Sequence, residues 1–297
     1  AATARVPIPA RGRSGNARRL IRVRTGDILQ RSCLRTLTIM SPESPLLFLA
    51  GFLGGLLNSI AGGGTFITFP ALLLAGVPPV SANATNTFAS CSGYLSGAYA
   101  FRNELRLHAG ELPKFISVGV AGGAAGAWLL LQTPEALFRE AIPWLLLLAT
   151  FLFVFGDKLN KTSRRLATRH RRASYVGKTL LFLLLTGVCI YGGFFNAGLG
   201  IVILSYLALA GHTDINTMNG LKLLVSSCVS LIAIALFIHE GVIAWSQGIM
   251  VLIGTLVGGY LAARVSRKIP QHFVRGFVVF ASVVITAYFF HDTYPPR

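Results

Sequence analysis

Ten apolar runs follow one another along the chain and form two series of five on either side of a polar stretch at 157–178. Each series opens with two short runs separated by glycines and continues with three longer runs. The first series covers 46–61, 65–77, 83–101, 114–132 and 139–156, and the second covers 179–195, 199–211, 217–238, 243–262 and 272–290. Because a helix needs about 20 apolar residues to cross a bilayer, this pattern predicts an all-α integral membrane protein.

The short second run of each series is too short to cross a membrane. Residues 65–77 and 199–211 would each reach about 20 Å as helices, against a hydrocarbon core about 30 Å thick. Irregular backbone is tolerated at that depth only where protein or a water-filled cavity satisfies its polar groups. Each short pair is therefore predicted to form a broken-helix hairpin whose glycine tip is buried in protein.

Composition agrees with a membrane location. Hydrophobic residues make up 53% of the 297 residues and charged residues only 12%, whereas soluble domains carry about 25% charged residues. This balance excludes an ordinary globular enzyme, a disordered protein and a disulfide scaffold. The length allows roughly seven to ten crossings.

The first 39 residues differ from the rest. They hold nine arginines and one acid, Asp27, and they contain no apolar run. Either Met40 is the translation start and 1–39 is upstream sequence, or the segment is an Arg-rich transit peptide. We favour the first reading, and in both cases we expect 1–39 to lie outside the fold.

The distribution of basic residues predicts sidedness. The 157–178 stretch carries eight Lys or Arg residues against one acid, so we expect it to be a cytoplasmic loop. The 102–113 and 263–271 connections are also basic. All three lie on one side only if each short pair returns to its starting side. This arrangement also makes 212–216 cytoplasmic, although that connection has no basic residue.

The two series resemble each other, which indicates an internal repeat of 40–156 and 179–297. Glycines at matching positions pair Gly63 with Gly198, Gly76 with Gly211, Gly122 with Gly254, and Gly126 with Gly258. Small residues four positions apart allow close helix packing. A hairpin plus three crossings changes sides, so the second unit must be inverted. Inverted repeats with broken helices are a recurring design of secondary transporters.

Three motifs also resemble a known family. They are Ala-Gly-Gly-Gly-Thr-Phe-Ile-Thr-Phe-Pro-Ala-Leu at 61–72, Gly-Val-Pro-Pro at 76–79 and Ala-Asn-Ala-Thr-Asn-Thr at 82–87. The chain resembles the sulfite exporter TauE/SafE family over 46–290, and Asn219-Gly220-Leu-Lys222 stands where that family repeats its motif. Thr217-Met-Asn219-Gly220 departs from the family's usual Ala-x-Gly-Thr. The resemblance implies a permease for small sulfur-containing or organic anions, driven by a proton or sodium gradient.

Several polar residues could carry an anion site. Helix N-termini behind glycine turns offer backbone N–H groups to oxyanions, and every acid from Met40 onward lies in a connection or at the end of an apolar run. The candidate substrate-binding residues are Asn58, Gly62, Gly63, Gly64, Thr65, Asn86, Thr87, Asn196, Gly198, Gly200, Asn219 and Lys222. The alternatives are that the glycines serve turns and packing, that Asn86 and Thr87 cap or join helices, and that Lys222 extends to the interface.

The sequence therefore predicts a secondary transporter of small anions in the cell (inner) membrane, with sulfite and sulfonates leading. A passive anion channel on the same scaffold is the alternative. A membrane enzyme or assembly factor is disfavoured, because no nucleophile–base constellation, cysteine pair or metal motif is present. We expect no cofactor, no catalytic residue, no metal and no nucleic-acid partner. A homo-oligomer is compatible with the sequence.

Overall fold

The computed structural model describes residues 43–60, 63–169, 175–265 and 271–294. The chain divides into a unit at Ala1–Ser44 and a second unit at Pro45–Arg297, and the fold below is that of the second unit. The expected N-terminal extension 1–39 and the site candidate Gly62 lie outside the described residues.

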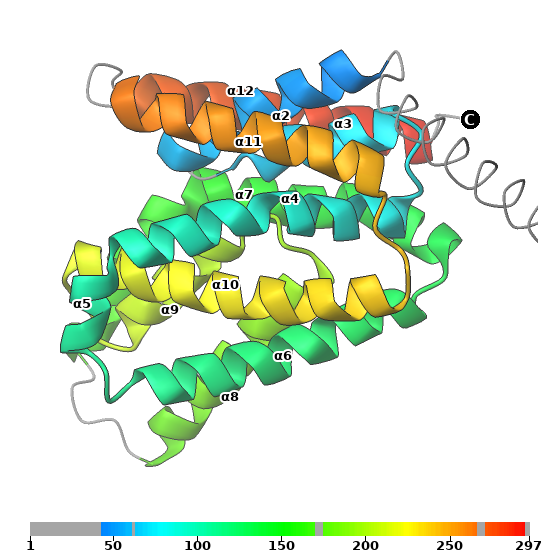
Figure 1. Ribbon diagram of the computed structural model, residues 1–297. Helices are drawn as coiled ribbons and strands as arrows, with labels where there is room; N and C mark the ends of the chain where they lie inside the picture. The colour runs from blue at the N-terminus through cyan, green and yellow to red at the C-terminus, as the bar shows by residue number, and fades with distance from the viewer. Residues whose placement is uncertain (1–42, 61–62, 170–174, 266–270, 295–297) are drawn as a thin grey trace, which may run out of the picture. The chain divides into compact units, whose positions relative to one another are not determined.

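The regular elements in these described ranges are all α-helices, which confirms the all-α prediction (Figure 1). They are α2 (Ser44–Ile60), α3 (Thr65–Leu74), α4 (Pro79–Ala100), α5 (Arg102–Leu107), α6 (Leu112–Gln132), α7 (Glu135–Arg169), α8 (Tyr175–Phe194), α9 (Leu199–Leu209), α10 (Ile215–His239), α11 (Trp245–Val265) and α12 (Gln271–Thr293). Each of the ten apolar runs corresponds to one helix, and α5 is a short addition in the 102–113 connection.

Two helix ends differ from the predicted ones. Helix α7 continues to Arg169, so much of the 157–178 stretch expected as a loop is helical. Lys, Arg and Glu are good helix formers, and an apolar run therefore does not mark where a helix stops. Helix α4 begins at Pro79 rather than at residue 83, because proline is favoured in the first turn of a helix.

Within the described residues, four helices are long and apolar enough to cross a membrane: Leu112–Gln132, Glu135–Phe155, Ile215–His239 and Gly276–Thr293. The shorter apolar helices include Thr65–Leu74 and Leu199–Leu209, the two runs predicted to be short. These lengths agree with a multi-pass membrane protein built partly from broken helices.

Both short pairs reverse direction. Gly54 of α2 packs against Gly64 and Thr68, so α3 runs back along α2. In the second pair, Phe194 at the end of α8 lies beside Gly126 of α6. Helix α9 then returns toward the start of α6, where the Tyr206 and Phe115 rings lie 6.4 Å apart. Each pair is therefore a hairpin that returns to the end where it began.

Glycines form two tight helix seams. A methyl group on Gly126 would overlap the carbonyl oxygen of Ile190 in α8, and one on Gly258 would overlap that of Phe52 in α2. An added Cβ on Gly122 would lie 2.5 Å from the Cys189 Cβ of α8, and one on Gly254 would overlap the Phe48 carbonyl oxygen of α2. The glycines at four-residue spacing are thus confirmed as packing seams, one joining α6 to α8 and the other α11 to α2.

The two ends of the unit are defined by contacts between connections. At one end, His212 lies 3.2 Å from Glu111, so the 212–216 connection lies beside the start of α6 (Figure 1). At the other end, Arg139 of α7 lies 3.8 Å from Asp292 of α12. The 212–216 and 102–113 connections therefore share one end, as the returning hairpins require.

Candidate functional site

The tips of the two hairpins meet at Tyr94 of α4. The Tyr94 hydroxyl donates to Asn196 Oδ1 over 3.4 Å, and the Thr65 side chain lies nearby. Thr65 opens α3, whereas Asn196 lies in the break between α8 and α9. Residues from both halves of the chain thus surround one hydroxyl. The Phe69 and Phe195 rings pack edge to face at 5.5 Å, and Phe195 is next to Asn196 in the chain.

Asn196 is held from two sides. It is 2% exposed, and its Nδ2 donates to Ser230 Oγ of α10 over 3.3 Å. Tyr94 and Ser230 were not among the predicted site residues, because both lie inside apolar runs that look like packing surface. The signal was available for Tyr94, since a tyrosine hydroxyl buried in an apolar helix requires a partner.

Asn86 is a buried polar side chain with one unpaired hydrogen-bond donor among the described residues. It is fully buried, and its Oδ1 accepts from the Thr68 hydroxyl of α3 over 2.5 Å. Its Nδ2 is a buried donor with no partner among the described residues. Leaving such a donor unpaired costs about 1–3 kcal/mol, and most buried polar groups are paired. Asn86 Nδ2 is therefore a buried donor that could stabilise an acceptor oxygen.

Backbone conformation favours glycine at both hairpin tips, Gly63 and Gly198. Gly63 has φ +148°, and an added Cβ would come within 2.8 Å of Val278 and 3.1 Å of Phe153. Gly198 has φ +76°, a left-handed conformation that glycine adopts readily, although Ala149 leaves ordinary space there. Turn geometry favours glycine at both positions, and packing adds to this only at Gly63. The binding of an anion by these tips stays a prediction.

Of the other predicted residues, Thr87 is hydrogen-bonded within its own helix and Asn58 has packing contacts. The Thr87 hydroxyl donates to the Asn83 carbonyl of its own helix over 2.9 Å. Asn83 Nδ2 donates to the Phe194 carbonyl, which ends α8, over 2.9 Å. Asn58 of α2 packs against Gly64 and lies near Gly93 of α4, between the first tip and that helix.

Lys222, Asn219 and Gly200 form a second group. Lys222 Nζ donates to Asn219 Oδ1 over 3.1 Å. The lysine stem passes Gly200 of α9 so closely that an added Cβ would lie 3.3 Å from Lys222 Cδ. Lys222 is the eighth residue of α10, and Asn86 is the eighth residue of α4. Each contacts the half-helix of its own half of the chain, α9 or α3.

The chain matches the family profile described as sulfite exporter TauE/SafE over residues 47–289. It is 32% identical over 251 residues to a "Probable membrane transporter protein" of Haemophilus influenzae, covering 83% of this chain and 94% of that protein. It is 28% identical over 268 residues to "Probable membrane transporter protein YfcA" of Escherichia coli K12, covering 88% and 96%. "Probable membrane transporter protein ORF9" of Sinorhizobium sp is 30% identical over 256 residues, with 84% and 94% covered. No solved structure gives a significant match.

Proposed function

Since the chain belongs to the sulfite exporter TauE/SafE family of membrane transporters, we propose that it is a secondary transporter of small anions. Sulfite, sulfonates and related organic anions are the leading substrates. The proposed site is the junction of the two hairpin tips, and the proposed location is the cell (inner) membrane.

The observation that carries this proposal is the buried Asn86 amide. Thr68 holds its oxygen, so the nitrogen offers an N–H donor beside the tip junction. A hydrogen bond from such a donor to a charged oxygen is worth about 1.5–3 kcal/mol. Sulfite and sulfonates present several such oxygens in a compact head. Asn58, Thr65 and Asn196 would supply further donors around it.

The charges support an anion rather than a cation. The buried polar side chains of the described residues are hydroxyls and amides, and none of them is a carboxylate. Cation and proton pathways usually carry a buried Asp or Glu. We assign to Lys222 the role of drawing the anion toward the site, and to Asn219 that of holding the lysine head.

The pattern of helix contacts supports alternating access by two inverted repeats. Helix α6 packs on α8, and α11 packs on α2 in the same way through glycines. Helix α7 contacts α9 while α12 contacts α3, and α4 contacts α10. Each of these contacts has a counterpart with the two halves exchanged. Rocking one repeat against the other around the tips would open the site to each side in turn.

Flux through purified protein in proteoliposomes tests the proposal. The panel comprises sulfite, sulfate, sulfoacetate and small carboxylates, each with and without a proton or sodium gradient. A transporter shows saturable uptake and counterflow, in which unlabelled anion inside accelerates entry of labelled anion. Saturable flux without counterflow or coupling would identify a passive anion channel, and no anion flux would reject the proposal.

The same assay tests the proposed organisation. We propose that 1–39 is not part of the fold and that 40–156 and 179–297 form the two repeats joined by 157–178. A chain that starts at Met40 should insert and transport as well as the full chain. Loss of insertion or flux on removing 1–39 would contradict this assignment.

A further inference from the structure

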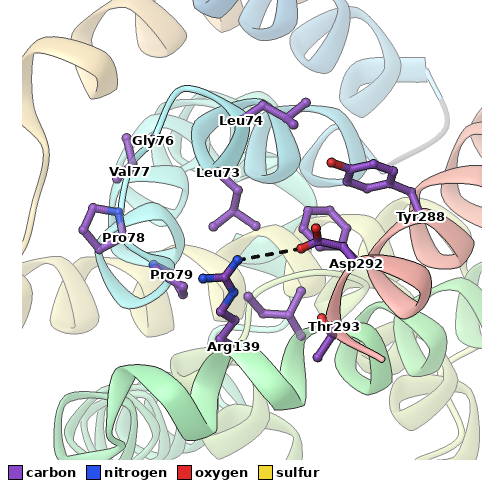
Figure 2. A pocket seen from close by; sticks show the side chains of 12 residues that line it. Leu73, Leu74, Gly76, Val77, Pro78, Pro79, Arg139, Tyr288, Asp292 and Thr293 are labelled. Carbon is purple, nitrogen blue, oxygen red and sulfur yellow. Dashed lines mark ion pairs between the residues drawn. The ribbon is translucent and has the colours of Figure 1, made fainter. Parts of the chain in front are cut away.

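A pocket lies away from the hairpin tips, at the end of the unit opposite His212 and Glu111. It encloses about 410 Å³, within the range of about 300–1,000 Å³ typical of small-molecule sites. Its walls come from the end of α3, the link from α3 to α4, the start of α7 and the end of α12 (Figure 2).

Two opposite charges meet across this pocket. Figure 2 shows Arg139 reaching from α7 toward Asp292 of α12. The two groups lie 3.8 Å apart, and their side chains are 67% and 44% exposed. An ion pair this long and this exposed is weak, because water and salt screen it. Arg139 can therefore exchange Asp292 for another oxyanion at little cost.

Of the Lys and Arg side chains that the structure describes, Arg139 is the one at this end. The other basic side chains that the structure describes are Arg102, Arg106 and Lys114 near the opposite end and Lys222 in the first half of α10. The neighbouring acid Glu135 is directed elsewhere, since its carboxylate accepts from the Val80 N–H of α4 over 3.2 Å. An anion that approaches this end thus finds one exposed guanidinium.

The rest of the pocket suits an organic group. Leu73, Ile142 and Phe289 supply apolar wall. Unpaired carbonyl groups at the end of α3 would repel an anion. The carbonyls of residues 71–73, however, accept hydrogen bonds from the N–H groups of residues 75–77. A cationic group above an apolar wall matches a small amphipathic anion.

The pocket is linked to the proposed transport site by α3. This half-helix has ten residues, so its two ends lie about 15 Å apart. Its first residue, Thr65, belongs to the tip junction, and Leu73 and Leu74 near its end line the pocket. An anion in the pocket therefore contacts the element that also forms the central site.

We propose that this pocket is a capture site in which Arg139 binds the sulfonate or carboxylate head of a small organic anion in place of Asp292. The apolar walls hold the organic part. This inference rests on the proposed anion transport and narrows its substrate class to sulfonates and carboxylates with a short apolar tail. Each methylene that enters the pocket should raise affinity by up to about fourfold.

The test is calorimetric binding of propane-1-sulfonate to the purified full chain in phosphatidylcholine nanodiscs. Arg139→Gln should weaken binding about tenfold or more, and Arg139→Lys should fall between it and the parent. Asp292→Asn should strengthen binding, because it releases Arg139. Arg106→Gln, an exposed charge change at the opposite end, is the matched control and should leave binding unchanged.

A capture site predicts that Arg139→Gln lowers the affinity for propane-1-sulfonate and that Asp292→Asn raises it, whereas a purely structural ion pair does not predict opposite effects. If Arg139→Gln and Asp292→Asn both weaken binding, or both leave it unchanged, the pair is only a structural contact and the capture site is overturned. A thermal unfolding curve for each variant identifies a folding defect. If Arg139→Gln fails to fold, the binding of propane-1-sulfonate to Arg139→Lys, which keeps the charge, is compared with that of the parent instead.

Two further measurements distinguish a lipid headgroup from a free anion as the ligand, and failure of the capture site from failure of the proposed transport function. Phosphatidylglycerol nanodiscs that suppress sulfonate binding in the parent but not in Arg139→Gln would show that a lipid headgroup occupies the pocket, and would overturn the assignment. Parental anion flux with an unchanged KM in Arg139→Gln would overturn the capture site and leave the proposed function standing. Binding that follows the predicted signs without any parental flux would support the pocket and reject transport.

Discussion

The Thr68 hydroxyl sets the polarity of the proposed site by donating to Asn86 Oδ1 over 2.5 Å. The same hydroxyl lies 3.2 Å from the Gly64 carbonyl at the first tip. Because a hydroxyl has one proton, donation to Asn86 turns the amide nitrogen toward the site, whereas donation to Gly64 would allow the amide oxygen to face it. The first arrangement favours an anion and the second a cation.

Asn86→Leu should therefore weaken anion binding by about 10- to 150-fold, the value of a hydrogen bond to a charged group. Asn86→Asp should weaken it further, because a carboxylate repels the ligand. Thr87→Val is the control on the same helix, since that hydroxyl bonds to the Asn83 carbonyl. Dissociation constants of the purified variants for sulfite measure the effect. Tighter binding of a cation to Asn86→Asp, with unchanged anion binding in Asn86→Leu, would contradict the site.

Tyr94→Phe should reduce transport while the protein still folds. The change removes the hydroxyl that contacts Asn196 and Thr65, so the two tips lose their shared partner. The expected loss of stability is about 0.5–1.5 kcal/mol, one ordinary hydrogen bond. Tyr99→Phe, on the exposed end of the same helix, should change neither property. Counterflow rates and unfolding curves provide the measurements, and equal flux in both variants would show that Tyr94 is only a packing residue.

Gly126→Val and Gly258→Val should destabilise the protein to a similar degree. Each added side chain would overlap a backbone carbonyl, of Ile190 in one seam and of Phe52 in the other. Overpacking of this kind costs about 1–3 kcal/mol. Gly187→Ala is the control, because no atom lies near its added Cβ and alanine favours a helix by about 1 kcal/mol. Thermal unfolding in detergent compares them. A large loss in one seam and none in the other would argue against equivalent repeats.

Sidedness can be tested with two exposed positions at opposite ends of the unit. In a cysteine-free background, Gly110→Cys lies in the connection before α6 and Ala136→Cys lies in the first turn of α7. We expect an impermeant maleimide to label position 136 in intact cells, and position 110 only after the membrane is opened. Labelling at 110 with protection at 136 would invert the topology and the assignment of the basic loops.

The stability of the 212–216 connection should depend on pH. His212 lies 3.2 Å from Glu111 and beside the His108 ring, and Asp214 follows it at the cap of α10. Burial lowers the pKa of His212 below its ordinary value of 6.5, although Glu111 opposes this shift. The unfolded chain then binds the proton more tightly, so stability present above pH 6.5 is lost as the pH falls through the folded pKa.

His212→Gln should flatten this part of the pH profile of the unfolding temperature. His239→Gln is the control, because that side chain is 82% exposed at the far end of α10. If the parent and His212→Gln lose stability in parallel on acidification, a different group is responsible.

The amino-acid sequence alone was enough to predict the helical membrane fold, the short hairpins and the glycine seams. These features depend on properties that local pattern records: the length of an apolar run against the thickness of a bilayer, and small residues at four-residue spacing. Gly126 and Gly258 could be predicted to lie in helix seams before their partners were known, because small residues at four-residue spacing allow helices to approach closely.

The tertiary structure alone decided which polar groups meet and which remain unpaired. Tyr94 and Ser230 lie in runs that read as apolar, yet they hold Asn196 from two helices. Arg139 and Asp292 come from opposite halves of the chain, and no spacing rule relates them. A hydrogen bond or ion pair depends on distances of about 3 Å between neighbouring helices, and hydrophobic periodicity says which face is buried without saying what lies against it.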